Sequence, residues 1–298
     1  MKDFPPPSRT RWSAPVTSLA ALRTAALPGL ILAAAGAPAL AAPLNATYRI
    51  HVGGVSVLEA QAVLTLTDRS YDVEVRAETG GFLGRLFPWQ TRSHSTGAVT
   101  GEALAPVRHT QTSLFRGKPR NVTLTYDGRG TVAAAVEPPP EEEDRPAVPE
   151  DLRRATVDPL SGVLSALVAT SRGNGCTRTV PVYDGRRRYD MTMRDSGMRT
   201  VSASRYSIFA GPARECRVTY TPVAGYSPRP PTTMFWKRDD GRDGAMADDR
   251  PPVDLWIAPV VAGAPPIPVR VETDSALGAV VIHLVAINGS PTPPPAGQ

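Results

Sequence analysis

The side chains that most often carry catalysis or bind metals are few in this chain and widely spaced. Its four histidines are His51, His94, His109 and His283, and none stands in the H-x-H or H-E-x-x-H spacing that brings two imidazoles to one metal ion. His51, His109 and His283 fall within stretches of strand-like alternation, so we expect them to be ordinary residues of a sheet. The histidines therefore predict no metal site.

Three further motifs resemble enzyme sites but lack residues that the chemistry requires. Ser161 in D-P-L-S-G is without the G-x-S-x-G turn that exposes a hydrolase nucleophile. The glycines of T-G-G-F-L-G (79–84) are not followed by the G-K-[ST] of a phosphate-binding loop. The acid pairs at 239–240 and 248–249 lie in a polar stretch, where solvation accounts for them. The sequence thus predicts no catalytic residue and no cofactor, and a protein that is not an enzyme.

One segment is unusually apolar for a connection between strands. Its bulky apolar side chains are Phe82, Leu83, Leu86, Phe87 and Trp89. Such a cluster could form a lid over a ligand or touch a membrane. The alternative is that it folds back as a plug of the core or as a short helix.

A second segment, Y-D-G-R-R-R-Y-D, gathers charge at a predicted hairpin turn. Arg186, Arg187 and Arg188 could contact an anionic headgroup, because guanidinium groups bind anions in a bidentate manner. The alternative is that these arginines pair with their own neighbours, Asp184 and Asp190.

The elements that position these residues follow a leader segment. Arg9, Arg11 and Arg23 precede an apolar run at 25–35, and Ala-Leu-Ala at 39–41 supplies the small residues of an A-x-A cleavage site. The stretch is broken by prolines and glycines and is short for a membrane span of about 20 residues. We therefore expect a signal peptide over 1–41 and a periplasmic mature chain without a transmembrane segment.

The expected export determines how the two cysteines are interpreted. In an oxidising compartment, Cys176 and Cys216 predict one disulfide that closes a loop of about 41 residues. The alternative is a redox or nucleophilic cysteine, but the chain has no C-x-x-C motif and no histidine near either cysteine in sequence.

Composition and charge exclude other classes of protein. The chain has 32 prolines and 25 glycines among 298 residues, which is untypical of a helical bundle. Its formal net charge is +5, but beyond residue 41 it is only +2, from 29 basic and 27 acidic residues. A body so nearly neutral does not predict nucleic acid as a partner.

Alternation of apolar and polar residues dominates from 46 to 126 and indicates antiparallel strands with one wet face. Further strands are predicted at 179–183, 188–194, 201–209, 216–220, 255–261, 269–273 and 279–287. We expect a mainly β fold: a strongly bent antiparallel meander, a half-barrel or open barrel of about twelve strands, with one or two helices packed on it.

The clearest helix begins at Asp158, a good N-cap, followed by Pro159 at the first helical position. Apolar residues follow at helical spacing, and this stripe needs a sheet to pack against: Leu160, Val163, Leu164, Leu167 and Val168. We expect one β-rich domain over 42–290, with a connector rich in proline and acid at 137–150, a mobile loop at 227–252 and a disordered tail at 291–298.

The order of several short motifs resembles an uncharacterised bacterial family called domain of unknown function 3108. The likeness covers roughly 46–288, and its most specific pieces are D-P-L-S at 158–161 and D-G-R-R-R-Y-D at 184–190, with Cys176 and Cys216 between and around them. Its other residues are Tyr48, Thr79-Gly80, Pro106, the prolines at 138–140, Tyr206, Gly211-Pro212-Ala213, Gly225, Trp256-Ile257-Ala258 and Pro268-Val269. The resemblance implies an exported envelope protein with a bent antiparallel sheet, and it supplies no activity.

A looser resemblance, of fold alone, is to periplasmic lipoprotein carriers, in which a half-barrel holds acyl chains under a helical lid. We therefore expect a non-enzymatic protein that binds a lipid or another apolar, acyl-bearing ligand in the concave face of its sheet. The alternative is a scaffold or assembly factor that binds another envelope protein by a sheet edge or by the loop at 227–252.

Overall fold

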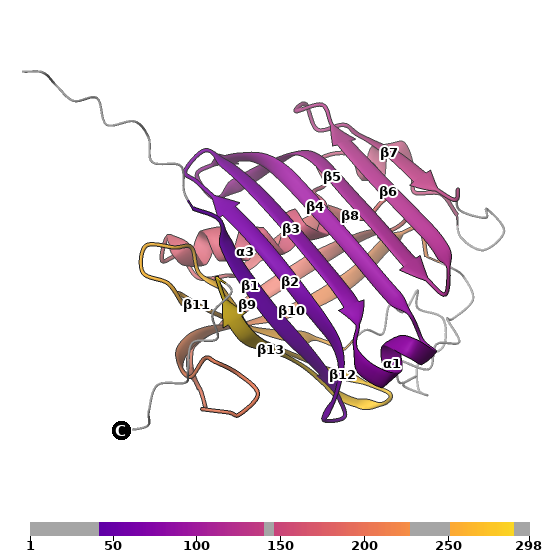
Figure 1. Ribbon diagram of the computed structural model, residues 1–298. Helices are drawn as coiled ribbons and strands as arrows, with labels where there is room; N and C mark the ends of the chain where they lie inside the picture. Colours follow the sequence, from indigo (N-terminus) through magenta and orange to yellow (C-terminus); the bar gives the residue numbers. More distant parts are fainter. Residues whose placement is uncertain (1–41, 140–145, 227–250, 289–298) are drawn as a thin grey trace, which may run out of the picture. The chain divides into compact units, whose positions relative to one another are not determined.

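The computed structural model describes residues 42–139, 146–226 and 251–288, apart from the side chain of Leu83. Thirteen strands form one antiparallel sheet, which confirms the predicted open meander (Figure 1). The strands are β1 Leu44–Val52, β2 Val55–Leu66, β3 Ser70–Thr79, β4 Trp89–Thr100, β5 Ala103–Phe115, β6 Lys118–Tyr126, β7 Val132–Glu137, β8 Arg178–Tyr183, β9 Arg188–Val201, β10 Gly211–Ala224, β11 Val253–Ala258, β12 Ile267–Ser275 and β13 Gly278–Ile287.

The sheet is a meander whose first and last strands lie beside each other. Its order is β7-β6-β5-β4-β3-β2-β1-β13-β12-β11-β10-β9-β8, so the only neighbours that are distant in sequence are β1 and β13. The backbone N–H of Asn288 donates to the carbonyl of Asn45 at 2.8 Å and fastens the two ends of the described chain. Strands β7 and β8 are left as the two edges.

A short segment between the two edges links them. The N–H of Ala155 donates to Gly130 O at 2.8 Å, and Val157 exchanges two backbone hydrogen bonds with β8, through Pro181 O and Tyr183 N. A second, smaller core lies at this junction, formed by Val122, Leu124, Val132, Val148 and Tyr183. The sheet is therefore open in its hydrogen bonding, but side chains and one segment join its edges.

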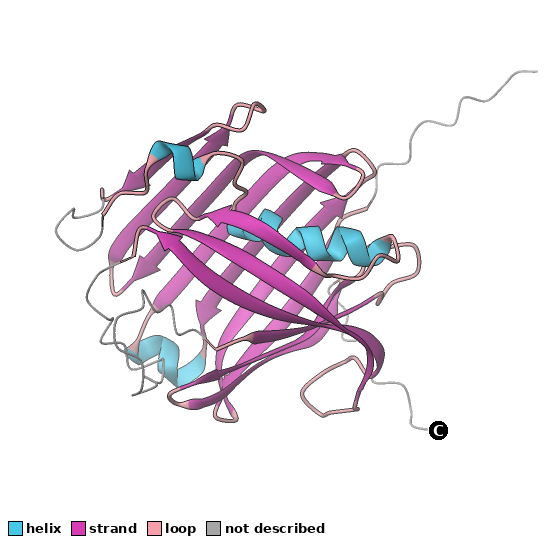
Figure 2. Ribbon diagram, turned by 180° about the vertical axis from the view of Figure 1, so that it is seen from behind, coloured by secondary structure: helices cyan, strands magenta, loops and turns pink. Residues whose placement is uncertain are grey.

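In the described part of the chain, three helices accompany the sheet: α1 Gly81–Leu86, α2 Glu150–Arg153 and α3 Pro159–Ser171. Helix α3 begins as predicted, with Asp158 as its N-cap and Pro159 in the first turn. Seen from behind, α3 lies within the bend, between the two arms of the sheet (Figure 2). Because it is enclosed there, it is buried nearly all round between Leu164 and Ala169, rather than along one stripe only, and Leu160 and Val163 are merely half-buried.

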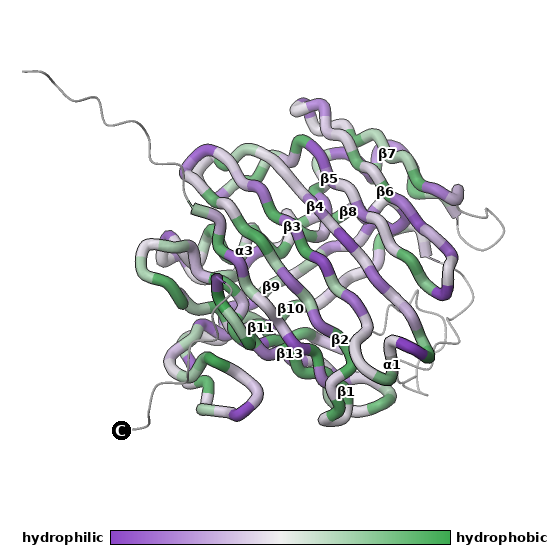
Figure 3. Tube along the Cα trace, in the orientation of Figure 1, coloured by the Kyte–Doolittle hydropathy of each residue, from purple (hydrophilic) through white to green (hydrophobic). Residues whose placement is uncertain are grey.

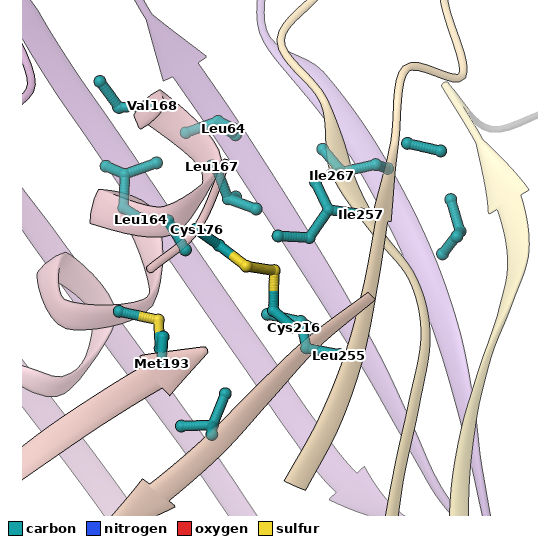
Figure 4. Packing of buried hydrophobic residues seen from close by; sticks show 14 of the residues in the cluster. Leu64, Leu164, Leu167, Val168, Cys176, Met193, Cys216, Leu255, Ile257 and Ile267 are labelled. Carbon is teal, nitrogen blue, oxygen red and sulfur yellow. A yellow bond between two sulfur atoms is a disulfide. The ribbon is translucent and has the colours of Figure 1, made fainter. Parts of the chain in front are cut away.

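The main core packs α3 against both arms of the sheet. The disulfide between Cys176 and Cys216 lies inside this core, and both cysteines are fully buried (Figure 4). It joins the segment after α3 to β10, across a sequence separation of 40 residues. The predicted disulfide is confirmed.

The structure corrects several predicted boundaries. The strand predicted at 201–209 is wrong except for Val201, the last residue of β9. Residues 202–210 form a loop in which serine hydroxyls bond the backbone: Ser204 Oγ accepts from Tyr206 N, and Ser207 Oγ accepts from Phe209 N. Strand β7 was not predicted, since its sequence V-A-A-A-V-E is rich in alanine, which favours strands weakly. Helices α1 and α2 raise the count from one or two to three.

Three predicted segments lie wholly or mainly outside the described residues. These are the leader at 1–41, most of the loop at 227–252 and the tail at 291–298. The connector at 137–150 is described only at its two ends, where it includes the last residue of β7 and the first of α2.

Candidate ligand-binding site

The inner face of the sheet is the one that meets α3. Ser95 on β4 contacts Asp158 at the start of α3, so the cross-strand row that contains Ser95 faces the helix. Since side chains of a strand alternate between faces, every second residue along each strand shares that side. Figure 3 shows the resulting alternation of hydrophobic and hydrophilic residues along the strands.

The apolar rows of the inner face become less buried toward one end of the sheet, although Ile50 of β1 stays buried there. Along β2 they pass from buried Leu64 to half-buried Ala60 and Leu58, and along β13 from buried Leu284 to half-buried Ile282. These positions run toward the end of the sheet at which α1 lies (Figure 1). We call them the open half of the inner face: Leu58, Ala60, Val75, Ala77, Val271, Val280 and Ile282.

Beneath α3, five polar side chains form a continuous buried network. Asp158 Oδ1 accepts from Ser95 Oγ at 2.6 Å and from the backbone N–H of Ser161 at 3.0 Å, while Asp158 Oδ2 accepts from Ser161 Oγ at 2.5 Å. His109 Nδ1 lies 2.7 Å from Ser95 Oγ and 3.2 Å from Asp158 Oδ1. Tyr71 completes the network, with its hydroxyl 2.7 Å from Ser161 Oγ.

The number of hydrogens on each group determines which atom donates in each hydrogen bond of the network. Ser95 and Ser161 each have one hydroxyl hydrogen, and both donate it to Asp158. The Tyr71 hydroxyl must then donate to Ser161 Oγ, and His109 must carry a hydrogen on Nδ1 that points at Ser95 and Asp158. Two chains of donors therefore converge on one carboxylate.

The electrostatics of the network favour a charged Asp158. Burial acts to raise the pKa of its carboxyl, but the hydrogen bond and charge of His109, followed by the hydroxyls of Ser161 and Ser95, outweigh burial and lower that pKa. Burial raises the pKa of Tyr71, which stays a neutral donor. The Asp158 carboxylate thus stays charged at the N-terminus of α3, where the helix dipole favours a negative group.

This arrangement holds the helix in place and is not built for hydrolysis. Ser95, His109, Asp158 and Ser161 each expose 1 % of their surface or less, so no substrate reaches them. In a hydrolytic triad the serine and the acid bond opposite nitrogens of the histidine, whereas both lie at Nδ1 of His109. His109 Nε2 is buried and has no partner among the described residues.

The sequence pointed to only part of this network. It identified Asp158 as the helix cap and placed His109 in a strand, but nothing in it linked the two. The link depends on β4 and β5 pairing in the register Ser95–His109 and on α3 docking above them.

The predicted lid residues lie in and beside α1 at one end of the sheet. Phe82, Leu86 and Phe87 are exposed, and Trp89 is half-buried at the start of β4. The backbone N–H of Trp89 donates to Thr79 Oγ1, which in turn donates to Phe87 O at 3.0 Å. The segment is a short helix, as one alternative held, but it does not plug the core. Leu83 belongs to α1, and its side chain lies outside the described part.

The three arginines of the predicted anion contact already have protein partners. Arg187 Nε donates to Asp184 Oδ2 at 3.1 Å, and Arg188 donates to Asp190 Oδ1 at 2.8 Å. Arg186 donates to the carbonyl of Pro138 at 3.0 Å, beside the β7 edge. The alternative interpretation, pairing with neighbouring aspartates, holds for Arg187 and Arg188.

Two hollows lie mainly outside the open half. One, of about 540 Å³, lies mainly on the outer face of β2–β6, meets the open half at Ala77 and is lined mostly by polar residues such as Gln61, Arg76, Arg92 and Thr112. The other, of about 340 Å³, lies between β7 and the β8–β9 hairpin and is lined by residues such as Val136, Val148 and Tyr183. Arg76 and Arg92 both donate to Glu74, so the arginine charges that line the larger hollow are already paired within the protein.

The described residues contain no cluster of three or more side chains suited to a metal ion. His51 and His283 lie next to each other on the outer face, with ring centroids 5.4 Å apart, and Tyr206 covers them. His94 contacts Asp72 on the same face. Across the described ranges, no helix has the length and apolarity needed to span a membrane.

The fold and site define a class: a single antiparallel sheet bent around one buried helix, with part of its inner face apolar and only half-buried. The chain belongs to the family described as protein of unknown function (DUF3108), whose model matches residues 47–285. This confirms the resemblance that the motifs indicated.

The chain was also compared with solved structures and with curated proteins. A solved β-barrel-like protein of domain of unknown function DUF1849 from Brucella abortus superposes with a TM-score of 0.47 at 10 % identity, over 83 % of this chain and 97 % of that chain. No curated protein matches.

Proposed function

We propose that this protein is an exported, non-enzymatic protein of the periplasm that binds the acyl part of a lipid on the open half of its inner face. The observation that supports the proposal most is that the apolar rows of the inner face change from buried to half-buried positions toward the α1 end, where Ala60, Val271 and Ile282 still border the main core. Residues such as Val75 and Ile282 point inward as core residues do, yet they are only half-buried. An apolar surface of this kind gains free energy when a ligand covers it.

The size of the gain suits a flexible acyl chain. Each methylene moved out of water contributes about 0.8 kcal/mol, so roughly ten of them would contribute about 8 kcal/mol before the costs of association. The available side chains are aliphatic and small, namely alanine, valine, leucine and isoleucine, and they carry no polar group that would select a head group. Specificity for a polar moiety would have to come from outside this surface.

Export and the lack of enzymatic activity rest on separate support. The leader with its A-x-A site is the basis for export, and the disulfide fits an oxidising compartment. The polar network that most resembles a catalytic constellation is fully buried and serves α3.

A matched pair of substitutions on β2 tests the ligand. Ala60 faces inward and is half-buried, and its neighbour Gln61 faces outward and is exposed. We expect lipid to co-purify with the wild type in native mass spectrometry, and a fluorescent fatty acid to bind. Ala60→Glu places a charge in the acyl path and should weaken binding about tenfold or more, whereas Gln61→Glu should leave it unchanged. Absence of lipid and of probe binding in the wild type, or equal loss in both variants, would overturn the proposal.

The alternative of a scaffold for another envelope protein gains no support from the described residues. The edge of β8 is already occupied in part by Val157, and most of the loop at 227–252 lies outside them. That alternative stays a prediction.

A further inference from the structure

Four connections at the α1 end of the sheet carry exposed apolar side chains. They are the β1–β2 turn, the β3–β4 connection with α1, the β5–β6 turn and the β12–β13 turn. Six large apolar residues there expose between 44 and 70 % of their surface, and we call them the apolar rim: Val55, Phe82, Leu86, Phe87, Phe115 and Leu277. Single exposed apolar residues are common, but six gathered on one end indicate a contact surface.

Strand pairing places these connections side by side. Trp89 pairs with Phe115, which brings the residues after α1 next to the β5–β6 turn. Leu58 pairs with Thr79, near the start of α1, and Val52 pairs with Val55. Gly53 N donates to Ala279 O at 3.0 Å, which joins the β1–β2 turn to the β12–β13 turn. The rim therefore follows one continuous end of the sheet, the end toward which the open half of the inner face runs.

The same end carries basic side chains. Arg85 lies in α1, and Arg116, Lys118 and Arg120 lie in and after the β5–β6 turn. All four are exposed. None of the four forms an ion pair with a described acidic residue, and the four connections (53–54, 80–88, 116–117 and 276–277) contain no acid. Their positive charge is thus available to an anionic surface.

Arg116 links the apolar and the basic parts of the rim. Its guanidinium carbon lies 5.2 Å from the ring centroid of Phe87 and 5.3 Å from that of Phe115. A cation stacked on two exposed rings keeps its charge beside the apolar groups without burying it. Aromatic rings with cations next to them are the residues that settle at the boundary between lipid headgroups and acyl chains.

We propose that the apolar rim docks this protein on the surface of a bilayer that contains anionic phospholipid, with Phe82, Leu86 and Phe87 inserted at the level of the headgroups. The partner is a membrane rather than a protein because the rim combines protruding apolar residues from separate turns with unpaired basic charge. This docking rests on the proposed function and extends it, since it would place the open half of the inner face at the lipid surface.

Vesicle flotation tests the docking directly. The probes are vesicles of phosphatidylcholine alone and of phosphatidylcholine mixed with phosphatidylglycerol, with the mature protein. We expect binding to the anionic vesicles, and a fall of about tenfold or more for the double variant Phe82→Ser/Leu86→Ser, because two large apolar side chains no longer enter the bilayer. Arg85→Ala/Arg116→Ala should weaken binding about tenfold or more on anionic vesicles, at roughly fivefold per charge.

Two exposed apolar residues away from the rim serve as controls. Val107→Ser and Met198→Ser remove equally exposed apolar side chains from β5 and β9 and should bind vesicles as the wild type does. Docking is overturned if the wild type fails to float with anionic vesicles, if the Phe82/Leu86 variant binds like the wild type, or if a control loses as much. Lipid that still co-purifies with a rim variant keeps the proposed function while docking fails, so the two outcomes are separable.

Discussion

The ring of Tyr71 lies against Gly97 on the neighbouring strand, and this contact lets the Tyr71 hydroxyl reach Ser161 at the start of α3. A Cβ atom at Gly97 would stand 2.6 Å from the Tyr71 hydroxyl and 2.5 Å from Ala105 O, so only glycine leaves room for the ring. Gly97 also follows a β-bulge in the β4–β5 ladder. One missing side chain in the sheet therefore supports the polar network that holds the helix.

Gly97→Ala is expected to destabilise the fold by roughly 1–3 kcal/mol, because the added methyl meets a fixed backbone carbonyl as well as the tyrosine. The matched control is Gly80→Ala, where nothing lies within 4 Å of the added methyl. Urea denaturation of both variants measures the difference. Equal stability of Gly97→Ala and the wild type would contradict the packing of Tyr71 over Gly97.

Removing parts of the polar network should give a graded loss. Tyr71→Phe removes one donor and leaves Ser161 Oγ bonded to Asp158, so we expect a cost of about 1 kcal/mol. Asp158→Ala removes the acceptor of two serine hydroxyls, of Ser161 N and of His109, and should cost roughly 3–5 kcal/mol. The free energies of unfolding in urea measure both. A smaller loss for Asp158→Ala than for Tyr71→Phe would contradict the convergence on Asp158.

The disulfide should carry a large part of the stability. Cross-linking residues 40 apart restricts the unfolded chain by roughly 4 kcal/mol in the chain-entropy account. We expect a strong reductant, or the double variant Cys176→Ala/Cys216→Ala, to lower the melting temperature by several degrees. The variant should also be insensitive to reductant. An oxidised and a reduced wild type that melt together would contradict this expectation.

The sequence predicted the sheet well where local pattern decides. Strands such as β3, with Tyr71, Val73 and Val75 alternating with polar residues, have a period that burial of one face imposes, and the structure confirms them. It failed at β7, where small alanines take their strand conformation from pairing with β6, and at 202–210, where serine side chains cap a loop. Those outcomes depend on neighbours that are not adjacent in sequence.

The sites show the same division. A cap at Asp158 follows from residue type, and a bond between Cys176 and Cys216 follows from residue type together with the export that the sequence predicts. The partnership of His109 with Asp158 does not, because it arises from a strand register and from the docking of α3 on the sheet. The exposure of Phe82 was also open, since an apolar segment can equally well fold into a core.

Stability should fall on mild acidification because of the histidine pair on the outer face. Burial lowers the pKa of His283 to about 4, helped by the charges of Arg270 and His51, and burial also lowers the pKa of His51. Arg270 lies directly across the strand from His283, and its charge opposes protonation of that ring. The charge of Arg49 acts in the same way on His51, where a backbone hydrogen bond at Arg49 offsets part of the effect. The folded protein therefore holds these imidazoles neutral.

The unfolded chain protonates its histidines near pH 6.5, whereas folded His283 does so only near pH 4. Between these values the unfolded state binds more protons, so the free energy of unfolding decreases as the pH falls through this window, by at most about 3 kcal/mol for His283. His283→Phe keeps a ring against Tyr206 and should flatten this decrease in the free energy of unfolding. Tyr206→Ala should make the decrease smaller, because it admits water to both imidazoles.

Urea denaturation at a series of pH values measures the slope of the free energy of unfolding against pH. Asp158 loses its contribution only below its ordinary pKa of 3.8, outside this window, and the glutamates Glu74 and Glu102 lose theirs below about 4.5, equally in the wild type and the variant. An unchanged slope between pH 6.5 and 4 in His283→Phe would show that the buried pair does not set the acid stability of this sheet.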